Sequence, residues 1–152
     1  MAPYNPGIYR NNYRTCPDFE NAGVGIVIRN GLLSSLTDIR QINGRIMAAT
    51  FDSTGSPLTF ITAYVPHGGY NTEIKEDFYE DLSSEIPNTR GIFYIGGDFN
   101  ARIHHVRDTD ICGRNIIGRR MEYLNIMNEN SKENRALFLG FCKMHNLYIL
   151  NI

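Results

Sequence analysis

Hydrophobic residues in this chain fall into short runs, and these runs predict β-strands. Three runs, at 23–28, 45–51 and 58–65, have the length and composition of buried strands. The second and third are separated by the turn-forming residues 52–57, which predicts an antiparallel hairpin. A further apolar run, at 91–96, ends at two glycines and predicts a fourth strand.

Two longer segments have the periodicity of helices. In residues 73–86 an apolar side chain recurs every four positions, and Thr72 and Pro87 supply start and stop signals. The rest of that segment carries six carboxylates and one lysine, a net charge of −5, which we interpret as a solvated face that includes Lys75 and Glu85. A second helix is predicted over 133–146.

The order of these elements predicts an α/β fold. Strand 58–65, helix 73–86 and strand 91–96 form a β-α-β unit, whose two strands are expected to be parallel. The second helix and a final strand at 147–150 are expected to repeat this arrangement. Because parallel strands end at one edge of a sheet, residues 64–67 and 97–100 are expected to share a rim.

Composition is typical of one globular domain. The chain has 152 residues, of which 42% are hydrophobic and 20% charged. Its net charge of −1 provides no general attraction to nucleic acid or to a membrane, so any nucleic-acid contact must come from a local patch. The chain has no Walker loop and no dinucleotide-binding glycine motif, so no small-molecule cofactor is expected.

Localisation follows from what the sequence lacks. Three cysteines are odd in number and not in metal-binding spacing, which indicates unpaired thiols in a reducing compartment. No apolar run is long enough for a membrane span, and no signal peptide is visible. We therefore expect an intracellular protein, nuclear or cytoplasmic, that is neither secreted nor membrane-bound.

Three polar side chains at the predicted rim can carry chemistry. Asp98 can act as a general base on a water or lie in the shell of a metal, and the amide of Asn100 can hold a phosphate oxygen or orient Asp98. Tyr64 can donate its hydroxyl to a phosphate. Each has a structural alternative, since Asp and Asn after two glycines often form turns and Tyr64 suits a half-buried strand. The segment itself slightly favours the turn for Asp98.

A basic segment follows this rim. Residues 101–120 carry a net charge of +3, from Asp108 and Asp110 and five arginines: Arg102, Arg107, Arg114, Arg119 and Arg120. Such arginines can position a nucleic-acid backbone, and a mixed-charge loop is an equally good interpretation. His104 and His105 with the two aspartates resemble metal ligands, although a solvated loop is the simpler interpretation. Residues 119–127 can form a short helix within this stretch.

Several of these motifs resemble those of a known family. The sequence Ile-Thr-Ala-Tyr-Val-Pro at 61–66, the helix around 78–82 and the sequence Ile-Gly-Gly-Asp-Phe-Asn-Ala at 95–101 are similar to the endonuclease/exonuclease/phosphatase superfamily. Residues 134–142 and 147–151 resemble its downstream helix and strand. The likeness is greatest to the endonuclease domains of non-LTR retrotransposons and to the craniofacial development protein 2-like sequences derived from them.

The resemblance implies a fold and a reaction. The fold is a four-layer α/β sandwich, with two packed mixed sheets flanked by helices. Residues 23–152 would be its central part, after an irregular lead-in at 1–22. The reaction is Mg²⁺-dependent hydrolysis of a phosphodiester in DNA. By resemblance Asp98 activates the attacking water, Asn100 orients that water and the phosphate, and Tyr64 contacts the phosphate.

The chain departs from the family pattern at both ends. The family has an early strand ending in asparagine and a Gln-Glu segment whose glutamate binds the metal, and neither precedes residue 23. Its Ser-x-x-Asp and Ser-Asp-His elements are also missing, so the metal site is incomplete. We expect a truncated endonuclease domain with weak or no activity alone. The alternatives are a non-catalytic nucleic-acid-binding or regulatory module on this scaffold, or a relative of phospholipid and inositol-phosphate phosphatases.

Overall fold

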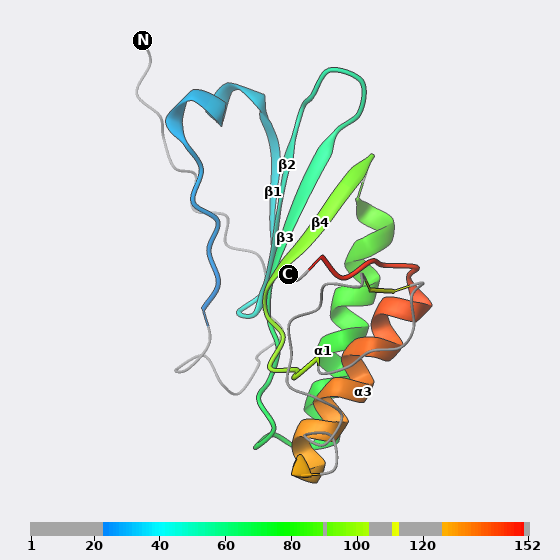
Figure 1. Ribbon diagram of the computed structural model, residues 1–152. Coiled ribbons are helices and arrows are strands. Elements are labelled where there is room, and N and C mark those ends of the chain that lie inside the picture. The colour runs from blue at the N-terminus through cyan, green and yellow to red at the C-terminus, as the bar shows by residue number, and fades with distance from the viewer. Residues whose placement is uncertain (1–22, 90, 104–110, 113–125, 151–152) are drawn as a thin grey trace.

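One four-stranded sheet with two long helices on one of its faces forms the part of the chain that the structure describes (Figure 1). The structure is a computed structural model, and it describes residues 23–89, 91–103, 111–112 and 126–150. The elements in chain order are η1 (Asn30–Ser35), β1 (Leu36–Asn43), β2 (Ile46–Phe51), β3 (Leu58–Tyr64), α1 (Thr72–Glu85), η2 (Ile86–Asn88), β4 (Ile92–Asp98) and α3 (Glu129–Met144).

The strand order is β1-β2-β3-β4, which makes the sheet mixed. The first three strands pair antiparallel, whereas β3 and β4 pair parallel across α1. The predicted α/β class, the β2–β3 hairpin and the first β-α-β unit are therefore confirmed. The helix predicted over 133–146 is also present, as α3, although it begins four residues earlier, at Glu129, and ends at Met144.

The start of the sheet differs from the prediction. Residues 23–29 form neither helix nor strand, so the strand predicted at 23–28 is wrong. The first strand is instead β1, which the hydrophobic pattern did not predict. Most side chains of β1 are exposed or half-buried because it is an edge strand, and its pairing with β2 is interrupted by register shifts at both ends. Polar edge strands lack the apolar alternation that predicts a strand.

The predicted pairing of residues 147–150 with β4 is also wrong. Among these residues Ile149 forms an isolated parallel bridge with Cys112, and its N–H donates to the carbonyl oxygen of Ile111 at 2.7 Å. The side chain of Ile149 is buried there. This segment therefore packs against residues 111–112, and the second β-α-β unit is not formed.

The core lies between the sheet and the helices. Side chains alternate along β3, so that Ile61 and Ala63 are buried toward the helices while Phe60 lies on the opposite face. The two helices contribute large apolar side chains to the same cluster, namely Phe78, Tyr79 and Leu82 from α1 with Phe138 and Phe141 from α3. Burial of these side chains is the main favourable contribution to folding.

The helix-free face of the sheet is apolar as well. The ring of Phe60 stacks on that of Tyr94 with 5.7 Å between centroids, and Phe51 lies edge-on to Phe60 at 6.0 Å. Phe60 is 40% exposed, Tyr94 47% and Ile92 56%. Together with Phe51, which is buried, these residues form a row of apolar side chains across β2, β3 and β4, and the described part of the chain leaves the β3 and β4 members open to solvent.

Two charged residues predicted to lie on a solvated face of α1 are buried. Lys75 is 1% exposed, and its Nζ lies 2.5 Å from Oε2 of Glu133 on α3. Glu85 is 4% exposed and accepts from the guanidinium of Arg40 on β1. Buried charges require partners, so these two pairs fix α1 against α3 and against the sheet.

The start of α1 also differs in detail from the prediction. Oδ1 of Asn71 accepts from the N–H of Ile74 at 3.0 Å, so Asn71 is the N-cap and the predicted Thr72 is not. The hydroxyl of Thr72 donates to Glu133 instead. Thr72 and Lys75 therefore both bind the same carboxylate of α3.

Replacement of Glu133 with glutamine tests this link between the helices. Hydrogen bonds from Lys75, and then from Thr72, hold the pKa of the Glu133 carboxyl below its usual value of 4.5. The carboxylate therefore stabilises the fold above that value, and its contribution is lost as the pH falls through the lowered pKa. We expect Glu133→Gln to be less stable than wild type at neutral pH, with the difference shrinking in acid. Urea unfolding across a pH series measures this difference.

A matched control is Glu129→Gln. Glu129 is exposed and pairs with Lys132 on the surface of α3, where ion pairs contribute little. Its effect on the free energy of unfolding should be small at every pH. A Glu133→Gln difference that does not change with pH would contradict the assignment of the helix link to this charge.

Candidate functional site

Tyr64 and Asp98 are direct partners in the sheet. In the parallel register of β3 and β4, the Cα of Tyr64 pairs with that of Asp98, and both side chains lie on the helix-free face. The N–H of Val65 donates to the carbonyl oxygen of Asp98 at 2.9 Å, which extends the pairing past Tyr64. The predicted convergence of residues 64–67 and 97–100 at one edge of the sheet is therefore confirmed.

The glycine before Asp98 is required by the close approach of β3. Gly97 has a φ of 145°, and a Cβ placed on it would lie 1.9 Å from the carbonyl oxygen of Ala63. Gly96 has no atom within 4 Å of its Cβ position. Only the second glycine of the pair is therefore sterically constrained, and it sets the position at which Asp98 leaves the strand.

Asp98 and Asn100 form a turn, as the structural interpretation of the sequence suggested. The N–H of Asn100 donates to Oδ1 of Asp98 at 2.8 Å, and Asn100 has a left-handed backbone with a φ of 47°. Its side-chain Nδ2 donates to the carbonyl oxygen of Val65 at 2.7 Å. The amide thus ties the two loops of the rim together, while the side chain of Asp98 remains exposed.

Phe99 points the other way from its two polar neighbours. Its ring packs on Phe138 of α3, with 4.5 Å between the centroids. The loop is therefore anchored on the core side by an aromatic contact and presents Asp98 and Asn100 outward.

Arg45 is a further rim residue, and the hydrophobic pattern placed it only at the start of a predicted strand. It lies in the turn before β2, is 6% exposed, and its guanidinium carbon lies 5.0 Å from the ring centre of Tyr64 and 5.3 Å from that of Tyr70. The guanidinium donates to the carbonyl oxygen of Tyr64 at 3.4 Å and to the hydroxyl of Tyr70 at 3.2 Å.

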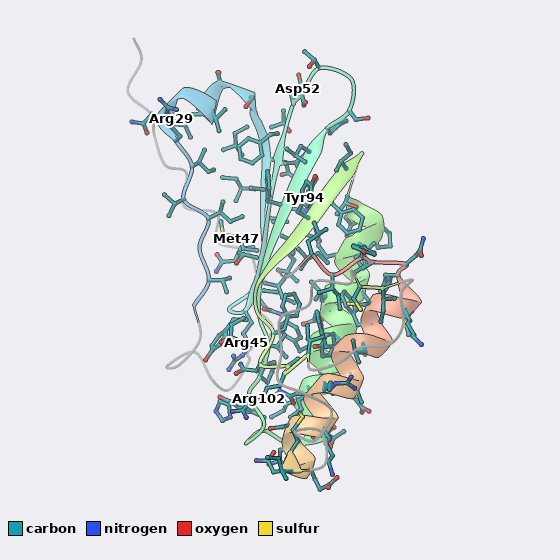
Figure 2. The ribbon with its side chains drawn as sticks, in the orientation of Figure 1. Arg29, Arg45, Met47, Asp52, Tyr94 and Arg102 are labelled. Atoms are coloured by element: carbon teal, nitrogen blue, oxygen red, sulfur yellow. The ribbon has the colours of Figure 1, made fainter. Side chains whose placement is uncertain are left out.

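The charge of Arg45 is not neutralised by a carboxylate within the described ranges of the chain. A buried cation of this kind favours an anion at the adjoining surface. The signal that could have found it is a lone arginine that opens an apolar strand at the same sheet edge as Tyr64. Figure 2 places Arg45 at the end of the sheet where Arg102 also lies.

Most of the predicted basic patch lies outside the described residues. Arg102 is exposed, just past the Asp98 turn. The structure does not describe Arg107, Arg114, Arg119 or Arg120, and the same holds for His104, His105, Asp108 and Asp110. The helix suggested at 119–127 also lies almost wholly outside these ranges, so these predictions stay predictions.

The described residues do not fit a complete magnesium site. They contain no group of three or more His, Cys, Asp or Glu side chains placed to hold one ion. Asp98 supplies a single carboxylate to the rim, whereas hard divalent cations take about six oxygen ligands.

No described helix has the length and apolarity that a membrane crossing requires.

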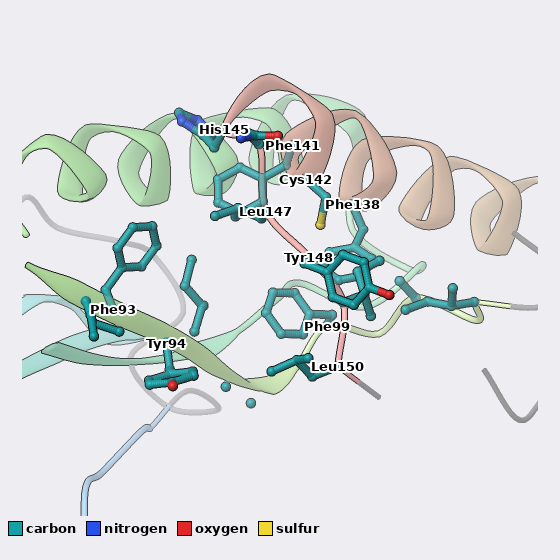
Figure 3. A pocket seen from close by; sticks show the side chains of 18 of the residues that line it. Phe93, Tyr94, Phe99, Phe138, Phe141, Cys142, His145, Leu147, Tyr148 and Leu150 are labelled. Atoms are coloured by element: carbon teal, nitrogen blue, oxygen red, sulfur yellow. The ribbon is translucent and has the colours of Figure 1, made fainter. Parts of the chain in front are cut away.

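A cavity of about 660 Å³ lies between β4 and the end of α3, on the helix side of the sheet (Figure 3). Its walls are mainly apolar and include Phe93, Phe99, Phe141 and Cys142. Burial raises the pKa of the Cys142 thiol to about 11, so this sulfur is protonated at neutral pH and a poor nucleophile. The cavity also has polar residues in its walls, such as His145 and Asn146, but Tyr64, Asp98 and Asn100 do not line it. Cys142 is a buried residue of the core.

Comparison of the chain with protein-family models, curated proteins and solved structures gave no match. The resemblance to the endonuclease/exonuclease/phosphatase superfamily therefore stays a prediction from its motifs.

Substitution of the two glycines tests the geometry of the rim. Gly97→Ala should destabilise the fold by about 2–3 kcal/mol, because the methyl group overlaps the backbone of Ala63 and the positive φ disfavours alanine. The free energy of unfolding of Gly96→Ala should lie within about 1 kcal/mol of that of wild type, since no atom lies within 4 Å of the position that the added Cβ would take. Urea unfolding of both variants measures the difference, and equal effects would show that β3 and β4 do not approach this closely.

Proposed function

We propose that this chain is a partial phosphodiester-binding domain of the endonuclease/exonuclease/phosphatase type, related to retrotransposon endonucleases. Its ligand is a DNA phosphodiester, and its hydrolytic activity alone is weak or absent. The observation that carries the proposal is the pairing of Tyr64 with Asp98 on neighbouring strands. The side chain of Asn100 joins the two segments, since its Nδ2 donates to the carbonyl oxygen of Val65, the residue after Tyr64.

The rim offers complementary groups to a phosphate. Arg45 supplies a buried positive charge beneath Tyr64, and the Tyr64 hydroxyl and exposed Arg102 supply further donors. The free Oδ2 of Asp98 can accept a proton from a water that approaches the phosphorus. Since several hydrogen-bond donors to a phosphate converge on one edge of the sheet, binding is the part of the chemistry that these residues support best.

Hydrolysis requires more than the rim supplies. In the family, Mg²⁺ polarises the phosphate, and Asp98 alone cannot hold it among the described residues. Asp98 and Asn100 are also engaged in the turn that shapes the loop. These two observations support weak activity and favour, as the second candidate, a non-catalytic DNA-binding module on the same scaffold.

We extend the proposal to the second sheet of the four-layer sandwich. In the complete domain that sheet packs on the helix-free face described above. The support for this is the row formed by Phe51, Phe60, Tyr94 and Ile92, whose size and apolarity are typical of an inter-sheet surface.

Plasmid nicking in the presence of Mg²⁺ tests the activity. The purified chain should nick supercoiled DNA no faster than its Asp98→Ala variant, because the metal ligands are incomplete. Gel electrophoresis of the plasmid over time measures the rate. Nicking that is clear in wild type and lost in Asp98→Ala would overturn the proposal of weak activity.

DNA affinity tests the binding surface. Fluorescence anisotropy with a short labelled duplex should show binding that weakens steeply with salt. Arg45→Met should reduce affinity about tenfold, because it removes charge-assisted contacts to the phosphate. Arg29→Met removes the same charge from an exposed position at the other end of the sheet, and should leave affinity within about twofold of wild type.

A double variant tests the predicted role of the basic segment at residues 101–120. Arg119→Ala/Arg120→Ala should also weaken DNA binding if residues 101–120 track the backbone as predicted. Equal binding by this double variant and wild type would count against a role of that segment. It would leave the rim, probed by Arg45→Met, as the site of contact.

A further inference from the structure

Asn134 lies where α3 meets the two loops of the rim. Its side chain is 1% exposed, and its Nδ2 donates to the carbonyl oxygen of Pro66 at 3.1 Å and to that of Asn100 at 3.2 Å. Pro66 follows β3 and Asn100 follows β4. One buried amide group therefore binds both segments that carry the candidate site.

The orientation of this amide is fixed by its partners. Both are carbonyl oxygens, which accept and cannot donate, so Nδ2 must face them. Oδ1 of Asn134 is buried without a hydrogen-bond partner in the described structure. A rotation of the amide would turn that oxygen toward the two carbonyl oxygens, so the group has a single favourable orientation.

The loop held by Asn134 needs external support. Asn100 has a left-handed backbone, which side chains other than glycine adopt at a cost. Its own Nδ2 binds Val65, so the rim is closed by three bonds: from Asn100 to Val65, and from Asn134 to Pro66 and to Asn100. Glu133, the neighbour of Asn134, is bound to Lys75 of α1, which keeps this turn of α3 in place.

We propose that Asn134 is a positioning residue of the rim. It holds the segment after β3 and the segment after β4 at a fixed separation, so that Tyr64, Asp98 and Asn100 are preorganised for a phosphodiester before it binds. The ligand part of this inference rests on the proposed function. The positioning of the rim itself does not, since it follows from contacts within the protein.

The first experiment measures the geometry of the rim without ligand. Asn134→Leu keeps a similar side-chain volume and removes both donated bonds. In ¹H–¹⁵N NMR spectra it should shift the backbone signals of Gly97 and Asn100 and accelerate hydrogen exchange at the Asn100 side-chain amide. Unchanged rim signals in Asn134→Leu would overturn the proposal.

A matched control separates positioning from loss of stability. Thr59 is fully buried on the helix side of β3, and its hydroxyl shares one hydrogen bond with Thr50 at 3.0 Å, near the far end of that strand. Thr59→Val also removes a buried polar contact, so it should lower stability while leaving the Gly97 and Asn100 signals in place. Equal changes in the rim signals for both variants would mean that Asn134 acts only through global stability.

The second experiment measures affinity for a short labelled DNA duplex. We expect Asn134→Leu to bind about tenfold more weakly than wild type and Thr59→Val to bind within about twofold of it. Equal binding by wild type and a folded Asn134→Leu would overturn the positioning role. If wild type does not bind DNA, the proposed function fails, while the NMR result still decides whether Asn134 sets the rim.

A third variant covers the case in which Asn134→Leu does not fold. Asn134→Ser keeps a small polar group that is too short to reach both carbonyl oxygens, so it should change the same rim signals in the same direction. A folded Asn134→Ser with wild-type rim signals would overturn the proposal equally well.

Discussion

The parallel pairing of β3 with β4 is the constraint on which the rest of this structure depends. It places Tyr64 beside Asp98, and it does so at a separation that only a glycine at position 97 permits. Everything else at the rim follows from this pairing, because the two chain segments leave the sheet at the same level. The turn at Asp98 then directs Asn100 back toward Val65. A strand register shifted by one residue would send Tyr64 and Asp98 to opposite faces.

The helices support this strand pairing by packing on the core face of the sheet. α1 is the crossover that makes β3 and β4 parallel, and α3 touches the rim directly through Phe138 and Asn134. The two helices are joined by a buried lysine and a partly exposed glutamate. Because a buried ammonium group is costly without a partner, this pair gives the helices one relative position where apolar contacts alone allow several. The ion pair therefore helps to fix the position of α3, whose Phe138 and Asn134 contact the rim.

The sequence predicted those features that depend on local pattern. The apolar stripe of α1, its proline stop and the two flanking runs were enough to predict the β-α-β unit and the shared rim. The features that were missed depend on residues distant in the chain. Lys75 is buried by a partner 58 positions away, and Asn134 binds carbonyl groups 68 and 34 positions away. Arg45 lies against the rings of Tyr64 on β3 and Tyr70 in the loop that follows. Strand β1 forms through its hydrogen bonds to β2, and its own sequence has no regular alternation of apolar and polar residues. No pattern within a short window contains this information.

The exposed side chains of Phe60, Tyr94 and Ile92 on the helix-free face have a consequence for the behaviour of the protein in a cell. Within the described residues, these side chains form a surface of the kind that chaperones bind and that drives proteins to aggregate. The amount of chain that stays in solution is then governed less by how stably it folds than by how quickly that surface is covered. The exposed apolar side chains, which are not part of the candidate site, therefore influence the abundance and turnover of the protein.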